Sequence, residues 1–247
     1  MFQIKNIERI IRLFEEYKTQ YNKPDIIGIL PMPIKELSSE YMAYTNNDEL
    51  MNCIKNLKNV TLYYNKKLFS NCDEYIKAVL FHEFTHISDA YNFVGLNNPN
   101  TLMTTYSEFN AKKIEILVKC NGKVPLLDDA ICDEGGTTTP REEIQNYLDM
   151  IVNISKTAKL YSDKIQERKA WLWNSYIKSY SWMFAYLSFF ENTQQKYFDE
   201  CFEKLDIYGQ KTLAKNIYKK IQNLEDVKEN PQQLISDVLD LYYVCFE

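Results

Sequence analysis

Apolar side chains recur at helical spacing over the first twenty residues. Ile4, Ile7 and Ile10 lie three residues apart with charged residues nearby, and the same spacing continues to Tyr17, which predicts an amphipathic helix over residues 3–21. Short runs rich in β-branched and aromatic residues follow and favour strands. We expect strands at residues 25–30, 41–45 and 60–65, and a short helix at residues 48–56.

A longer periodic stretch predicts a helix over residues 73–92, with Ser70 or Asn71 as its N-cap. One stripe of this helix is apolar and should face the core: Ile76, Leu80, Phe84 and Ile87. A second stripe should face a cleft: Tyr75, Val79, His82, His86 and Asp89. Another helix should run from about residue 101 or residue 106 to residue 120, with Asn121-Gly122 as the signal that ends it.

The pattern changes at residues 133–139, which are rich in Gly and Thr. Thr139 as N-cap, Pro140 at the first helical position and Glu142 as a capping-box residue then predict a new helix. Helical periodicity dominates the remainder, at residues 140–160, 163–191, 194–206, 209–223 and 231–245. We therefore predict an α+β, mostly helical fold. Residues 1–134 should form a domain with a small sheet and residues 135–247 an all-helical region, and both can share one core.

Composition narrows the class of protein. Apolar residues make up 45% of the 247 residues and Gly and Pro are few, which favours a folded, helix-rich protein. The net charge is −5 and no long basic run occurs, so we expect no nucleic-acid partner. Residues 170–190 hold a single charged side chain but also several Ser and Tyr, which favours a buried aromatic helix over a membrane span.

The cysteines and the N-terminus bear on the compartment. The six cysteines are far apart and form no C-x-x-C pair, so we expect reduced and mostly buried thiols. The first residues lack a continuous apolar core and a cleavage site of small residues, so they do not resemble a signal peptide. The sequence therefore predicts a cytoplasmic protein.

The chemistry is concentrated in His82-Glu83-Phe84-Thr85-His86, and these two histidines are the only two in the chain. Positions four apart share one face of a helix, so both imidazoles can bind one metal ion. Glu83 lies at the flank of that face, where it can act as a general base on a metal-bound water. The H-E-x-x-H pattern in a predicted helix therefore indicates a zinc site.

A catalytic zinc site usually has three protein ligands and a water. With no third histidine, the third ligand should be a carboxylate, with a cysteine as the less favoured option. Glu108, 22 residues after His86, is the best candidate if its helix begins near residue 101, whereas a start after Thr105 would make it a capping-box residue. Glu115 is the second choice, and Cys120 and Asp89 are weaker. The metzincin pattern is excluded, because Asp89 and Asn92 stand at its later Gly and His positions.

The motif and Glu108 together resemble the gluzincin branch of zinc metallopeptidases, and the layout of residues 60–120 is most similar to the ImmA/IrrE-like intracellular peptidases. One position departs from the thermolysin-like enzymes, which carry Asp four residues after the ligand Glu, where this chain has Lys112. The resemblance implies a small sheet whose edge strand precedes the H-E-x-x-H helix and binds an extended substrate. Residues 60–65 are the expected edge strand.

The resemblance implies an intracellular zinc-dependent peptidase that acts on a protein or peptide. Glu83 would take the proton of the attacking water and pass it to the leaving amine. The oxyanion needs a further donor, for which the candidates are Tyr106, Tyr91, Tyr44 and Arg141. Asp89 could orient His86. The alternative is a non-catalytic or regulatory metal-binding protein that acts through protein–protein contacts. The C-terminal aromatic residues are expected to form a core.

Overall fold

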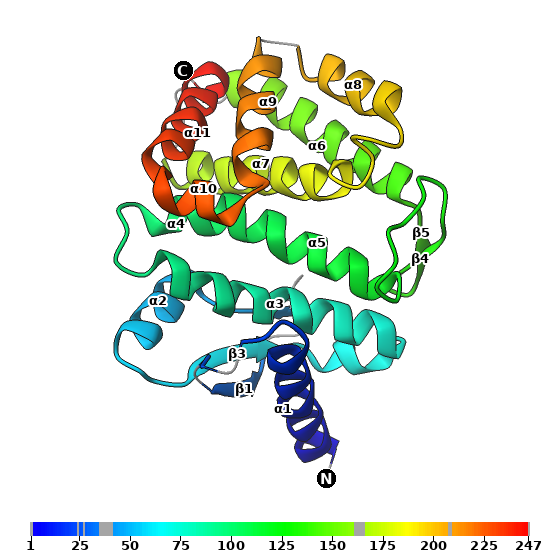
Figure 1. Cartoon of the computed structure of the whole chain (residues 1–247), viewed down its shortest axis with the longest axis vertical. Helices are drawn as coiled ribbons and strands as arrows, with labels where there is room; N and C mark the ends of the chain where they lie inside the picture. The colour runs from blue at the N-terminus through cyan, green and yellow to red at the C-terminus, as the bar shows by residue number, and fades with distance from the viewer. Residues whose placement is uncertain are drawn as a thin grey trace. The chain divides into compact units, whose positions relative to one another are not determined.

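The computed structural model describes residues 2–23, 25–26, 28–34, 42–160, 166–206 and 209–246. These residues are mostly helical and include two small sheets (Figure 1), so the predicted α+β class is confirmed at this coarse level. The chain divides into two compact units. The first comprises Met1–Gly95, Asn110–Val124 and Ala130–Thr138, and the second comprises Leu96–Phe109, Pro125–Asp129 and Thr139–Glu247.

The larger sheet of the first unit has three strands in the order β1-β3-β2. The central strand β3 (Val60–Tyr64) pairs in parallel with β1 (Ile29–Pro33) and antiparallel with β2 (Ala43–Tyr44). The prediction that residues 60–65 form the edge strand is therefore wrong. Strand propensity identifies the strand but carries no information on strand order, which depends on contacts between distant segments. Among the described residues, the two strands at the edges of this sheet are β1 and β2.

Strand β1 begins later than predicted and includes two prolines. The backbone N–H of Ile34 donates to the Tyr64 carbonyl at 2.8 Å, so N–H groups an even number of residues away face β3. Pro31 and Pro33 are offset by an odd number, and their nitrogens face the outer edge of the sheet. A proline at such a position removes no hydrogen bond of the ladder. The prediction that this strand covers residues 25–30 and ends before Pro31 is therefore wrong.

Helix α1 (Phe2–Gln20) and helix α3 (Asp73–Phe93) share an aromatic core. The Phe14 and Phe84 ring centroids lie 4.9 Å apart, and those of Tyr17 and Phe81 lie 5.3 Å apart. The predicted core stripe of α3 is confirmed, since each of its four members is at most 1% exposed. Helix α2 (Asn47–Lys55) also contacts α3.

The middle of α3 is buried on every side. All residues from 81 to 90 are buried. The members of the predicted second stripe in this range, His82, His86 and Asp89, therefore do not face an open cleft. The N-cap of α3 is Cys72, which makes no side-chain capping bond. Asn71 instead donates to Lys67 and Leu68 carbonyls of the preceding 3₁₀ turn, η1 (Lys66–Ser70). The predicted cap at Ser70 or Asn71 is therefore wrong.

A β-hairpin that the sequence pattern did not predict follows in the first unit. Strands β4 (Ile131–Asp133) and β5 (Gly136–Thr138) pair across a turn in which Gly135 has φ +71°, a conformation that glycine adopts easily.

All six cysteines are free, but only Cys53, Cys201 and Cys245 are buried, so the prediction of mostly buried thiols is only partly correct. Burial and the hydrogen-bonded thiol of Cys72 raise the pKa of Cys132 to about 11.

The second unit is helical in its described residues. Its helices are α4 (Pro99–Leu102), η2 (Met103–Ser107), α6 (Pro140–Leu160), α7 (Gln166–Leu187), α8 (Gln195–Lys204), α9 (Gln210–Ile221), α10 (Leu224–Glu229) and α11 (Pro231–Phe246). The predicted capping box is confirmed, because the Thr139 N–H donates to the Glu142 carboxylate at 2.9 Å and the Glu142 N–H donates to the Thr139 hydroxyl at 3.2 Å.

Helix α7 supplies much of the core of the second unit. Tyr176, Tyr180 and Phe184 of this helix, and Phe190 just after it, are at most 1% exposed. The predicted aromatic core is confirmed for these residues, whereas Trp173, Trp182 and Phe189 are half-buried and Trp171 is 65% exposed. The Tyr176 hydroxyl donates to the Gln210 side-chain oxygen at 2.9 Å, which gives this buried polar group a partner. Within the ranges that the structure covers, no helix is long and apolar enough to cross a membrane.

Candidate metal centre

The two histidines of the chain lie one helical turn apart in the buried middle of α3. Their ring centroids are 4.8 Å apart and their planes meet at 81°. His82 and His86 are 8% and 6% exposed. The spacing of four residues therefore brings both imidazoles to one point, as the sequence predicts.

Glu108 is the first residue of helix α5 (Glu108–Lys119), but α5 directly continues an earlier helical segment. Helical structure starts at Pro99 and continues through η2, a π-helical turn, into α5. The Thr105 hydroxyl donates to the Thr101 carbonyl at 2.6 Å, as expected within a helix and not at an N-cap. The capping-box alternative for Glu108 is therefore wrong. A π-helical turn commonly marks a functional position in a helix.

His82, His86 and Glu108 are a buried group that could hold a metal ion. Each offers one ligand atom, and these atoms lie within 4.8 Å of one another. Tetrahedral zinc with ligands at about 2.0–2.2 Å needs its ligand atoms about 3.3 Å apart, so the three atoms would have to move closer together to bind zinc. No other group of three or more such side chains is found among the described residues.

Glu115, the second choice for a ligand, contacts His82 instead. Its carboxylate lies 3.0 Å from His82 Nδ1, and since an ionised carboxylate only accepts, Nδ1 carries the proton. Nε2 is then the ring nitrogen that can bind a metal. A carboxylate behind a histidine ligand fixes the tautomer and makes the imidazole a stronger donor to the metal. Sequence spacing alone did not predict this role.

Two lysines hold Glu115 in its ionised form. Lys112 Nζ and Lys119 Nζ both lie 2.9 Å from Glu115 Oε1. Although burial opposes ionisation, the two ammonium groups and the hydrogen bond from His82 hold the pKa of Glu115 well below its usual range. Lys112 stands where the thermolysin-like pattern has Asp, and it forms an ion pair with the carboxylate of Glu115, three residues later in the helix.

Glu83 is anchored by the residue that follows the edge strand β2. Its Oε2 accepts hydrogen bonds from the Thr45 backbone N–H at 2.9 Å and from the Thr45 hydroxyl at 3.2 Å. Glu83 is 8% exposed. The contact places the end of β2 beside the residue that the motif assigns as general base.

Within the first unit, helix α3 and residues 110–119 of helix α5 run antiparallel. Asn110 Nδ2 donates to both Asp89 carboxylate oxygens at 3.1 Å, and Glu115 lies opposite His82. Numbering therefore rises along one helix as it falls along the other, as the sequence predicts for a helix that returns beside the motif. The described partner of Asp89 is Asn110, and orientation of His86 by Asp89 stays a prediction.

The candidate oxyanion donors occupy different settings. Tyr106 is 6% exposed within η2, and Tyr44 stacks on Tyr63 with ring centroids 4.9 Å apart. Tyr91 lies half-buried on α3. Arg141 binds Asp128 through two hydrogen bonds of 2.7 and 3.1 Å, which commits its guanidinium to an exposed ion pair. Arg141 is therefore the weakest of the four candidates.

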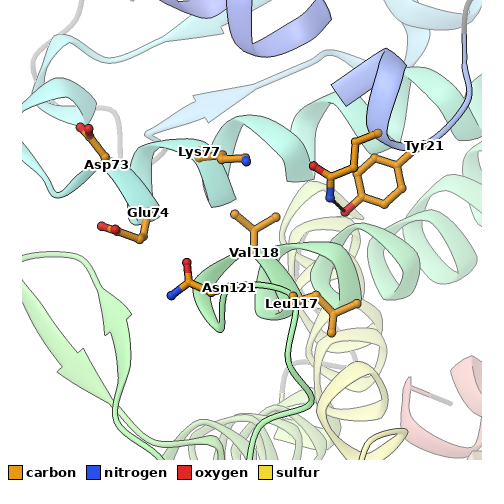
Figure 2. Close-up of a pocket in the computed structure, with 9 residues that line it drawn as sticks. Tyr21, Asp73, Glu74, Lys77, Leu117, Val118 and Asn121 are labelled. Atoms are coloured by element: carbon orange, nitrogen blue, oxygen red, sulfur yellow. Dashed lines mark hydrogen bonds between the residues drawn. The ribbon is translucent and has the colours of Figure 1, made fainter. Parts of the chain in front are cut away.

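The first unit also contains a pocket of about 580 Å³ that lies away from the motif (Figure 2). Figure 2 shows it bounded by the start of α3, with Asp73 and Lys77, and by the end of α5, with Val118. Two of its three charged lining residues form ion pairs with residues outside the lining: Asp73 with Arg9 at 2.6 Å, and Lys77 with Glu16 at 2.5 Å. None of the metal-group residues lines this pocket.

Comparison of the chain with protein-family models, with curated proteins and with solved structures finds no match. The basis for a function is therefore the residues themselves. They are a buried group of two histidines and a glutamate that could hold a metal ion, with Glu83 beside it.

Proposed function

We propose that the protein is a zinc-dependent peptidase of the gluzincin type, which hydrolyses a peptide bond of a protein or peptide substrate. The observation that carries the proposal is the buried group of His82, His86 and Glu108. Two histidines and a glutamate are one of the ligand sets of catalytic zinc. A fully closed structural site would need a fourth side chain, and that group contains three.

In this proposal the chain holds the metal through His82 Nε2, His86 and Glu108. Zinc in such a site activates a water and polarises a peptide carbonyl. Glu83 takes the proton of the attacking water and delivers it to the leaving amine. Thr45 binds Oε2 of Glu83, which fixes the orientation of the carboxylate. Glu115 keeps His82 in the required tautomer.

The alternative is a metal-binding protein without catalytic activity. The same three ligands serve both functions, so metal binding alone does not separate them. The presence of Glu83 next to His82, anchored by one oxygen at 2.9 Å from Thr45 N, favours the peptidase. A purely structural metal site does not require a general base at this position.

The test is direct detection of peptide-bond hydrolysis. A defined mixture of peptides from a digested proteome is incubated with the zinc-loaded protein, and new termini are identified by mass spectrometry. The proposal predicts cleavage products that a zinc chelator suppresses and that added zinc restores. A protein that binds zinc but yields no such products, from peptides or from intact proteins, would support the non-catalytic alternative.

A further inference from the structure

Helix α7 reaches the carboxylate of Glu108 with two side chains. Lys178 Nζ lies 2.5 Å from Oε1, and the Trp182 indole N–H donates to Oε2 at 2.9 Å. Positions four apart on a helix share one face, so both groups approach Glu108 from the same side. Because the Glu108 side chain is 5% exposed, these contacts lie in a largely dry environment where hydrogen bonds are strong.

The same stretch of α7 holds the helical turn before Glu108. The Ser181 hydroxyl lies 3.4 Å from the Thr104 carbonyl in η2. Trp182 also packs edge-on against Tyr147 of α6, with ring centroids 5.6 Å apart and an angle of 64°. The indole is thus fixed by packing on one side and by its hydrogen bond on the other, and it has little freedom to leave Glu108.

The two contacts differ in charge. The Trp182 N–H is neutral and occupies one lone pair of Oε2, so it can orient the carboxylate without repelling a divalent cation. Lys178 carries a full positive charge, and a metal ion bound to the same carboxylate would repel it. The Lys178 side chain is 32% exposed, so it can withdraw toward solvent.

We propose that α7 sets the metal affinity of the site: Trp182 is a positioning residue that holds Glu108 for the metal, and Lys178 competes with the metal for the same carboxylate. The inference rests on the proposed function, since it takes Glu108 as a zinc ligand. It assigns to the helical C-terminal region a part in the metal site, through residues 70 and 74 positions away from Glu108 in sequence.

The test measures zinc affinity by competition with a chromophoric chelator, so no substrate is needed. Trp182→Phe, which keeps the packing on Tyr147 but removes the N–H donor, should weaken zinc binding by about 10- to 100-fold. Lys178→Met should strengthen it by about fivefold, because zinc no longer has to displace a partly exposed ion pair. Two variants of α7 serve as matched controls and should bind zinc like the wild type: Trp173→Phe and Lys169→Met.

The two variants should change the zinc affinity in opposite directions, so a general loss of stability cannot explain both results. Wild-type affinity in Trp182→Phe, or weaker zinc binding in Lys178→Met, would overturn the inference while the proposed function stands. A wild-type protein without zinc affinity would overturn both. Circular dichroism of each variant verifies folding, and if Trp182→Phe does not fold, the Lys178→Met result alone supports or overturns the competition.

Discussion

Replacing Glu83 with glutamine should leave zinc in the protein and lower the rate of peptide hydrolysis by about two to four orders of magnitude. Glutamine has the shape of glutamate and can still accept the hydrogen bond from the Thr45 N–H, which is 2.9 Å from Oε2. It cannot take a proton from the attacking water. The measurement is the cleavage rate of one identified substrate peptide, together with the zinc content of both proteins.

A control on the same helix separates the loss of a base from the loss of a charge. Glu74 is exposed at the start of α3, and Glu74→Gln should cleave the peptide at the wild-type rate. If Glu83→Gln retained full activity, the general base would have to be another residue. If it lost zinc together with activity, Glu83 would act as a ligand or as a structural residue.

Replacing Glu115 with alanine should destabilise the protein by about 3–5 kcal/mol, since removing one partner from a buried ion pair is strongly destabilising. The Lys112 and Lys119 side chains are 10% and 3% exposed, and both would lose the carboxylate 2.9 Å away. The free energy of unfolding in urea measures this effect. Zinc affinity should fall as well, by about 10- to 100-fold, because His82 loses the partner of its Nδ1.

An exposed ion pair provides the comparison for Glu115. Glu225 binds Lys228 at 3.1 Å, with side-chain exposures of 65% and 38%. Such a pair contributes about 0–1 kcal/mol, so Glu225→Ala should have a small effect. A loss of less than about 1 kcal/mol in Glu115→Ala would show that the lysines find other partners, and that the cluster does not depend on Glu115.

The contacts of Glu115 with His82, Lys112 and Lys119 also predict how the stability of the protein depends on pH. The folded-state pKa of Glu115 is well below its usual value, so between the two pKa values the unfolded chain binds more protons than the folded chain. The stabilisation is then complete above the ordinary glutamate pKa of about 4.3 and is lost as the pH falls through the folded-state value. In Glu115→Gln, the free energy of unfolding should fall less steeply below about pH 4.

The geometry of the H-E-x-x-H motif could be predicted from sequence because it is local. Helical spacing alone brings His82 and His86 together, and counting ligands then requires an acidic third residue. Glu108 satisfies that requirement in the group of potential ligands. The helices of the second half were predictable for the same reason, since amphipathic periodicity and the Thr139 capping box are features of nearby residues.

The remaining features depend on contacts between distant residues. The partner of His82 is Glu115, 33 residues away, and the tryptophan on Glu108 is 74 residues away. No spacing rule predicts either contact. The prediction that residues 60–65 form an edge strand failed for the same reason, since β3 is central only because β1 and β2 pair with its two sides. The two prolines of β1 are compatible with a strand only because that strand is at an edge.

The most direct test of the proposed metal centre, on which the proposed function depends, is the zinc content of the purified protein after dialysis against zinc-free buffer. The ligand set of His82, His86 and Glu108 predicts about one zinc per chain in the wild type, and the same in Glu83→Gln. His86→Ala removes one of only two histidines and should hold less than about a tenth of that amount. A wild-type protein without zinc, or a His86→Ala protein with the full amount, would contradict the proposed metal centre.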